Sequence, residues 1–166
     1  VGHVKDLPRS ELGIDIENDF KIALKVLPDK NKFIKELRKK SKTAERVMIA
    51  TDPDREGEAI AAHLASEVPE EKLERVQFTE ITKRGIQEGI SKVRDINHNL
   101  VSAQTARRVI DRLVGYKVSP VLWATLQSNM KFVKTNLSAG RVQSAAVKII
   151  VDRDRLRSNF KRTRYF

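Results

Sequence analysis

The chain has 166 residues, of which 40% are apolar and 33% charged, so it can form a packed core and is not a disordered chain. It has no cysteine, which excludes disulfide scaffolds and thiolate metal sites. No apolar run approaches the roughly 20 residues that a membrane span needs. Because the first residue is Val1 and not methionine, we expect a piece of a longer protein.

The charge is distributed unevenly along the chain. Residues 1–100 contain 19 Lys and Arg and 19 Asp and Glu, so this part is neutral. Residues 101–166 contain 14 basic and 3 acidic residues and carry the whole net charge of +11. A strongly basic part is typical of proteins that bind a polyanion such as nucleic acid. A solvated helix face would give the same composition.

In the first part of the chain, short apolar runs alternate with amphipathic segments. The predicted elements are an extended segment at 24–27, a helix over 31–43, a buried strand at 47–50, a helix over 53–68, a strand at 76–78 and a helix capped by Thr82. This alternation predicts an α/β fold with a parallel sheet.

After about residue 92 the pattern becomes helical. The predicted elements are a connector at 93–99, helices over 102–114, 119–126 and 138–157, a basic loop at 127–136 and the start of a strand within 160–166. In the last helix the spacing of Val142, Ala146, Ile149 and Ile150 predicts a face that packs against a core. We therefore expect an α/β domain over 1–92 and a basic helical domain over 93–166.

Three carboxylates, Asp52, Asp54 and Glu56, follow the predicted buried strand at the start of a helix. The carboxyl ends of parallel strands are where such sheets bind ligands, and carboxylate oxygens suit Mg²⁺. A structural interpretation competes, because Asp52 can cap the helix, Pro53 can begin it and acidic residues complement its dipole. Arg55 fits either a counterion or a phosphate clamp.

Arginines mark two of the predicted helices. Arg107, Arg108 and Arg112 lie in the helix over 102–114, where Asp111 can pair with only one of the first two, so we expect an arginine to be available for a phosphate. In the last helix, with Ser138 as the predicted N-cap, Arg141 falls in the first turn. A cation is unfavourable there, which favours an anion docked on the free N–H groups. Exposed arginines without a ligand are the alternative.

Five segments of the chain resemble motifs of the type IA DNA topoisomerases and occur in the same order as in that family, and the bacterial topoisomerase I branch fits best. They are residues 2–8, 50–64, 78–82, 106–120 and 137–144. The segment at 50–64 is similar to the acidic motif of the family's Toprim fold. The resemblance implies a partial Toprim domain over 1–92, with a Rossmann-like parallel sheet and flanking helices but without its first strand. Residues 93–166 would be part of the helical domain that binds single-stranded DNA in a groove.

The family breaks one DNA strand with a tyrosine, holds a 5′-phosphotyrosine, passes the other strand and reseals, which relaxes negative supercoils without a nucleotide cofactor. By resemblance Asp52, Asp54 and Glu56 hold Mg²⁺, and Arg55 is a further catalytic candidate. We expect weak Mg²⁺ binding, because the family's glutamate on the missing strand is absent, and no zinc. The residues expected to bind DNA are His3, Arg107, Arg108, Asp111, Arg112, Arg141 and Gln143.

The family's nucleophilic tyrosine belongs to a later domain, and neither Tyr116 nor Tyr165 fits its position, so we expect this chain alone not to cleave DNA. We expect a monomer that binds single-stranded or underwound DNA, with no membrane partner, in the cytoplasm at the nucleoid. The acidic motif and the arginine helices are expected to line one groove. The alternatives are reverse gyrase, another Toprim enzyme such as a primase or nuclease, a phosphohydrolase using Asp-x-Asp, and a non-catalytic nucleic-acid-binding module.

Overall fold

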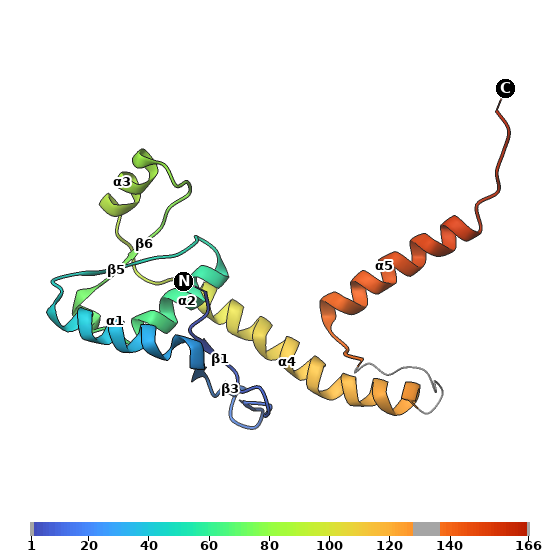
Figure 1. The fold of residues 1–166 in the computed structure, drawn as a ribbon, viewed down its shortest axis with the longest axis horizontal. Coiled ribbons are helices and arrows are strands. Elements are labelled where there is room, and N and C mark those ends of the chain that lie inside the picture. The colour runs from blue at the N-terminus through green and yellow to red at the C-terminus, as the bar shows by residue number, and fades with distance from the viewer. Residues whose placement is uncertain (1, 128–136, 166) are drawn as a thin grey trace. The chain divides into compact units, whose positions relative to one another are not determined.

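The computed structural model describes residues 2–127 and 137–165, and the chain divides into two compact units, Val1–Val109 and Ile110–Phe166 (Figure 1). Most of the predicted basic loop therefore lies outside the described residues. The division between these units falls inside one helix, α4, between Val109 and Ile110.

The first unit contains three small sheets and four helices, counting the start of α4, within the described part of the chain. Parallel strands β5 and β6 form one sheet, with Val47 opposite Leu73, and the pairs β1–β4 and β2–β3 are antiparallel. The elements are β1 (Lys5–Asp6), β2 (Ile14–Asp15), β3 (Lys21–Ile22), β4 (Lys25–Val26), α1 (Asn31–Thr43), β5 (Val47–Ala50), α2 (Arg55–Ala65), β6 (Leu73–Val76) and α3 (Lys83–Ser91), with short 3₁₀ turns at Pro28–Lys30 and Glu70–Lys72.

The core of the first unit lies where α1 and α2 meet strand β5 and the N-terminal segment. It is built from apolar side chains that are spaced for burial in each element, because α1 turns its lysines outward and α2 carries alanines on its inner face. The fully packed members are Val4, Ile34, Ile49, Ala61 and Leu64. This core fixes β5 and α2 relative to one another and so positions the acidic turn between them.

The second unit, Ile110–Phe166, is called the helical unit below. Helix α4 (His98–Gln127) begins in the first unit and continues into the helical unit, which also contains α5 (Arg141–Ser158). In the second unit the Ser119 hydroxyl accepts a hydrogen bond from the Ala139 amide at 3.0 Å, and the Trp123 indole N–H donates to the Leu137 carbonyl. These contacts hold the segment before α5 against α4. None of the residues of α5 is buried in the described part of the chain.

Several predicted boundaries are wrong. The helices expected over 102–114 and 119–126 are one continuous helix, α4. It contains Pro120 in its interior, although proline removes one main-chain donor there. The strand expected at 76–78 ends at Val76. Residues 160–165, the described part of the expected final strand, form none. The face of α5 predicted to pack is exposed, with Ile149 at 69%.

Candidate nucleic-acid and metal site

The acidic turn, residues 51–56, connects the end of β5 to the first turn of α2. Asp54 is the N-cap of α2, and its Oδ1 accepts a hydrogen bond from the Gly57 amide at 2.7 Å. An aspartate caps the helix, as the structural interpretation predicts. The capping residue is Asp54 and not Asp52, and the helix begins at Arg55 and not at Pro53. The side chains of Asp52, Asp54 and Arg55 are exposed.

Gly57 allows the turn to fold tightly against α2. A Cβ atom at this position would lie 2.0 Å from the Asp52 carbonyl oxygen, so only glycine permits this approach. The Thr51 hydroxyl donates to the Gly57 carbonyl at 2.7 Å. The backbone that carries Asp52 and Asp54 is thus held by the helix it precedes.

Glu56 joins three segments of the first unit. Its carboxylate lies 2.8 Å from Nε2 of His3, which comes from the N-terminal segment, and accepts hydrogen bonds at 3.3 Å from the amide of Gln104 on α4. The structure therefore brings together His3 and Glu56, two of the predicted site residues. Gln104, which is only 6% exposed, was not predicted as a site residue, and no local pattern around it in the sequence marks it as one.

The three predicted metal ligands do not form a preassembled site. Among the described residues no three Asp, Glu or His side chains are gathered so that they could hold a metal ion. Asp54 caps α2, and Glu56 is occupied by His3 and Gln104. The residues present therefore do not form a complete Mg²⁺ site, because two of the three carboxylates are engaged by the protein itself.

A small pocket beside Glu56 is lined by several basic residues. His3, Lys5 and Arg108 line it together with His63 and Asp6, and Asp6 forms an ion pair with Arg108. The burial of His63, reinforced by the neighbouring His3, Lys5 and Arg108, lowers its pKa to about 4, so its ring is neutral at pH 7. The His63 Nδ1 atom is buried and has no hydrogen-bond partner among the described residues.

A buried ion pair, Glu58 with Arg75, lies beneath the acidic turn. The two side chains are 0% and 1% exposed, and Arg75 Nη2 lies 2.8 Å from Glu58 Oε1. Burial opposes ionisation of Glu58, but hydrogen bonds from the Asn97 amide, Arg75 and Gln77 outweigh it and lower the pKa of the carboxyl. Neither partner of this pair was among the site residues predicted from the sequence.

In the helical unit, α5 begins at Arg141, whose Nε lies 3.4 Å from Oδ1 of Asp111 on α4. Two predicted site residues are therefore brought together. The N-cap of α5 is Gly140 and not Ser138. Arg141 is thus the first residue of the helix, a position that favours anions over cations.

Two further predicted residues of this unit have partners inside it. The Arg112 guanidinium lies 5.2 Å from the centre of the Tyr116 ring and donates to its hydroxyl at 3.3 Å. The Gln143 amide oxygen accepts a hydrogen bond from the Ser138 hydroxyl at 3.2 Å. Arg107, on α4, belongs to the first unit and its side chain is half-buried.

Two segments of the chain match known protein families. Residues 1–81 match the Toprim domain family, and residues 95–166 match the DNA topoisomerase family. The predicted fold class, a Toprim domain with a small parallel sheet followed by a helical segment, is confirmed. The chain belongs to the type IA DNA topoisomerases.

The structure of full-length topoisomerase I from Thermotoga maritima is similar, with a TM-score of 0.81 and 44% sequence identity. The similarity covers 97% of this chain and 26% of that protein, so the chain spans about a quarter of its relative's length. No helix in the described part of the chain is long and apolar enough to cross a membrane.

Proposed function

We propose that this chain supplies the acidic turn and part of the DNA-binding surface of a type IA topoisomerase. That enzyme would break and reseal one DNA strand through a 5′-phosphotyrosine and relax negative supercoils. The observation that carries the proposal is the agreement of both family segments, in order, with 44% identity to a topoisomerase I over 97% of the chain.

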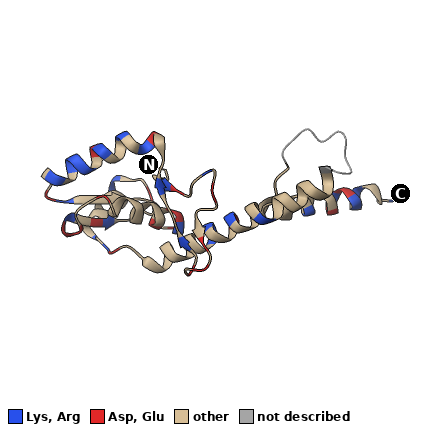
Figure 2. Cartoon of the chain, turned by 90° about the horizontal axis from the view of Figure 1, so that it is seen from below, with Lys and Arg blue, Asp and Glu red and all other residues tan. Residues whose placement is uncertain are grey.

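The part of this function that the chain performs by itself is binding of single-stranded DNA. Lys and Arg residues occur along α4 and α5, as the colours of Figure 2 show, and residues 101–166 carry the whole net charge. Each phosphate that they neutralise would release counterions. Arg107, Arg108, Arg112 and Arg141 are the proposed phosphate contacts, and His3, Asp111 and Gln143 are further residues proposed to bind DNA.

For Mg²⁺ we propose weak binding through Asp52, Asp54 and Glu56, with Arg55 beside them. Asp52 and Asp54 are exposed where β5 ends. A bound ion would compete with the Gly57 amide for Asp54 and with His3 for Glu56. This competition is the physical reason to expect low affinity.

We propose neither tyrosine of this chain as the nucleophile. Tyr116 lies in the middle of α4, and Tyr165 lies outside any helix or strand. We therefore propose that the isolated chain, a monomer, binds DNA without cleaving it. A covalent protein–DNA adduct formed by this chain would contradict this.

The experiment is fluorescence anisotropy of a labelled single-stranded oligonucleotide titrated with the chain, with a duplex of the same sequence as control. We expect tighter binding to the single strand and a loss of affinity of about tenfold or more between roughly 50 and 200 mM salt. Equal affinity for both DNAs would contradict the single-strand preference. An affinity that salt leaves unchanged would contradict phosphate binding itself.

A further inference from the structure

We propose that the buried pair Arg75–Glu58 is a positioning device that holds the acidic turn in the shape from which Asp52, Asp54 and Glu56 act. The importance of that shape rests on the function proposed above. The pair touches none of the three carboxylates, so Arg75 and Glu58 are positioning residues and not catalytic ones.

Arg75 uses the full donor capacity of its guanidinium. An arginine has five N–H donors. Nε and Nη2 of Arg75 lie 2.9 and 2.8 Å from Glu58 Oε1, and Nη2 also donates to the Asp52 carbonyl at 3.1 Å. Nη1 donates to the carbonyls of Ile49, at 3.3 Å, and Val76.

These acceptors belong to four different parts of the first unit. Ile49 is in β5, Asp52 is in the acidic turn, Val76 ends β6 and Glu58 is in the first turn of α2. The one guanidinium therefore ties the ends of both parallel strands to the helix that follows the turn. The hydrogen bond to the Asp52 carbonyl acts on the same oxygen that Gly57 approaches so closely.

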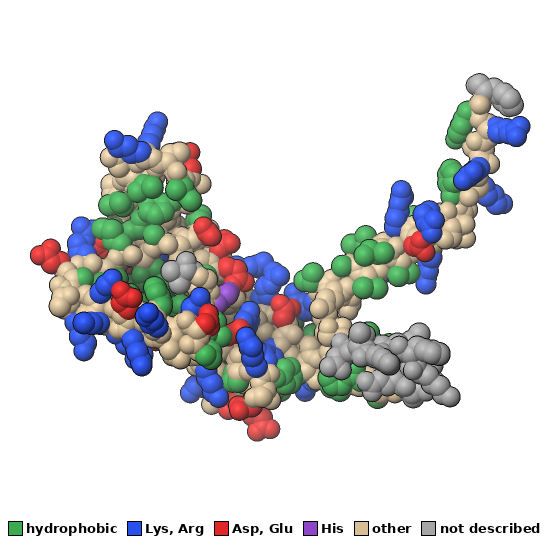
Figure 3. Space-filling view, in the orientation of Figure 1, with side chains coloured by type: hydrophobic (Ala, Val, Ile, Leu, Met, Phe, Trp, Pro, Cys, Tyr) green, Lys and Arg blue, Asp and Glu red, His purple; other side chains and the backbone are tan. Residues whose placement is uncertain are grey.

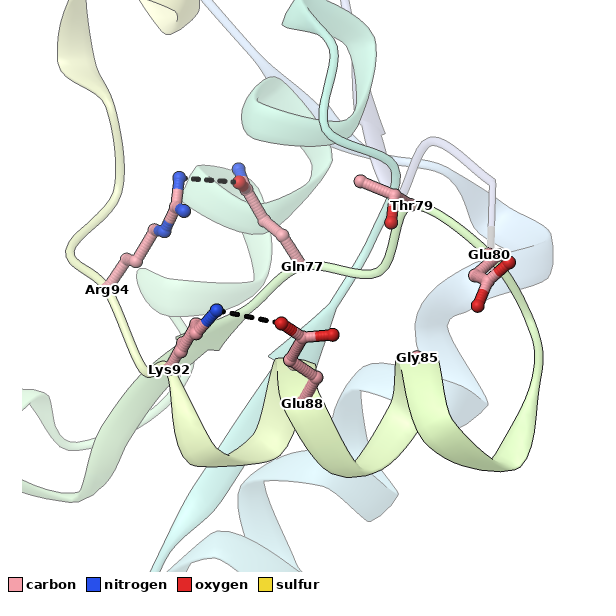
Figure 4. Close-up of a pocket in the computed structure, with 8 residues that line it drawn as sticks. Gln77, Thr79, Glu80, Gly85, Glu88, Lys92 and Arg94 are labelled. Atoms are coloured by element: carbon pink, nitrogen blue, oxygen red, sulfur yellow. Dashed lines mark hydrogen bonds and ion pairs between the residues drawn. The ribbon is translucent and has the colours of Figure 1, made fainter.

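Glu58 is held from its other side. Gln77 donates to Oε1 at 2.7 Å and the Asn97 amide donates to Oε2 at 3.0 Å. Figure 4 shows Gln77 turned toward Arg94, which donates to it at 3.4 Å. A buried pair that is saturated in this way adds little net stability over apolar side chains, but removing one partner leaves a buried charge. A role in fixing geometry accounts for it better.

The test compares the two ends of α2 in the full chain. Glu58→Gln and Arg75→Lys disturb the pair at the acidic turn. Glu67→Gln is the matched control, because Glu67 is 5% exposed just beyond the other end of α2 and pairs with Lys5 and Arg38 at 2.6 and 2.5 Å. The readouts are hydrogen exchange of the Gly57 amide by NMR and Mn²⁺ binding by isothermal titration, both at a temperature where all variants are folded.

We expect exchange at Gly57 to accelerate by about tenfold or more in Glu58→Gln and Arg75→Lys, because a charged buried hydrogen bond is lost, and to change by less than about twofold in Glu67→Gln. Mn²⁺ affinity should change in the first two variants only, because they alter the backbone that carries Asp52 and Asp54. Unchanged Gly57 exchange in the folded variants, or an equal acceleration in Glu67→Gln, would overturn the proposal.

Should Glu58→Gln and Arg75→Lys both fail to fold, Gln77→Ala removes one donor to Glu58 from a half-buried position and is judged by the same exchange measurement. A wild-type chain that binds no Mn²⁺ refutes the proposed metal site. The Gly57 exchange rates still decide whether the pair positions the turn.

Discussion

The first unit and the helical unit use the same kinds of residue in opposite ways. In the first unit, apolar side chains such as Ile49 are buried and the ion pair between Glu58 and Arg75 is buried as well. In the helical unit, α5 leaves Ile149 and Ile150 more than 60% exposed, and hydrophobic side chains are visible along it in Figure 3. An apolar stripe thus shows that a helix has a packing face, but not what covers that face.

Two glycine substitutions, one in each unit, should differ most in their effect on the free energy of unfolding. Gly57→Ala places a methyl group 2.0 Å from the Asp52 carbonyl and should lower the free energy of unfolding by more than about 3 kcal/mol. Gly115→Ala, inside α4, meets only the Ala139 carbonyl at 4.0 Å and should raise stability by up to about 1 kcal/mol. Urea unfolding measures both changes, and similar losses in the two variants would contradict the contrast.

The contrast in burial gives the next largest effect. Ile49→Ala, in β5 at 5% exposure, should cost about 2 to 3 kcal/mol because it leaves a cavity in the core. Ile149→Ala, at 69% exposure in α5, should change the free energy of unfolding by less than about 0.5 kcal/mol. A large loss for Ile149→Ala would show that its face is covered in solution.

Acid should weaken the first unit through His63. Burial lowers its pKa from 6.5 to about 4 in the folded chain, so below pH 6.5 the unfolded chain binds the extra proton and stability falls until about pH 4. The stability advantage of wild type over His63→Gln should therefore shrink by up to about 2 kcal/mol between pH 7 and 5. An advantage that stays constant with pH would show that the ring is not buried as described.

The smallest effect is expected from a surface ion pair in the helical unit. Lys148 and Asp152 pair across one turn of α5 and both are largely exposed. Asp152→Ala should change the free energy of unfolding, measured by thermal unfolding, by only about 0.3 kcal/mol. A loss as large as that of a buried pair would mean that α5 is packed against something.

Local patterns predicted much of the first unit. The apolar run at 47–50 is β5, the helix over 31–43 is α1, and Thr82 caps α3 by accepting from the Gly85 amide. The position of β6 was missed because Arg75, a charged residue, occupies a buried strand position. Its burial depends on Glu58, 17 residues earlier, and no local pattern contains that partnership.

The candidate site was predicted as a set of residues without their contacts, and the shared groove expected for them stays a prediction. The acidic motif, His3 and the arginines could be named from their order along the chain. The partners that hold them, such as Gln104 on Glu56 and Asp6 on Arg108, come from distant segments that only the fold brings close. The spacing of residues along the sequence does not predict such contacts.

The most direct measurement compares matched losses of charge in the two units. Arg112→Ala with Arg141→Ala removes two cations from the helical unit, and Lys32→Ala with Lys39→Ala removes two exposed cations from α1. Binding to a labelled single strand should weaken about tenfold in the first double variant, with a salt slope smaller by about two, and change less than about twofold in the second. Equal weakening in both variants would show that only total charge matters and that the helical unit holds no DNA-binding surface.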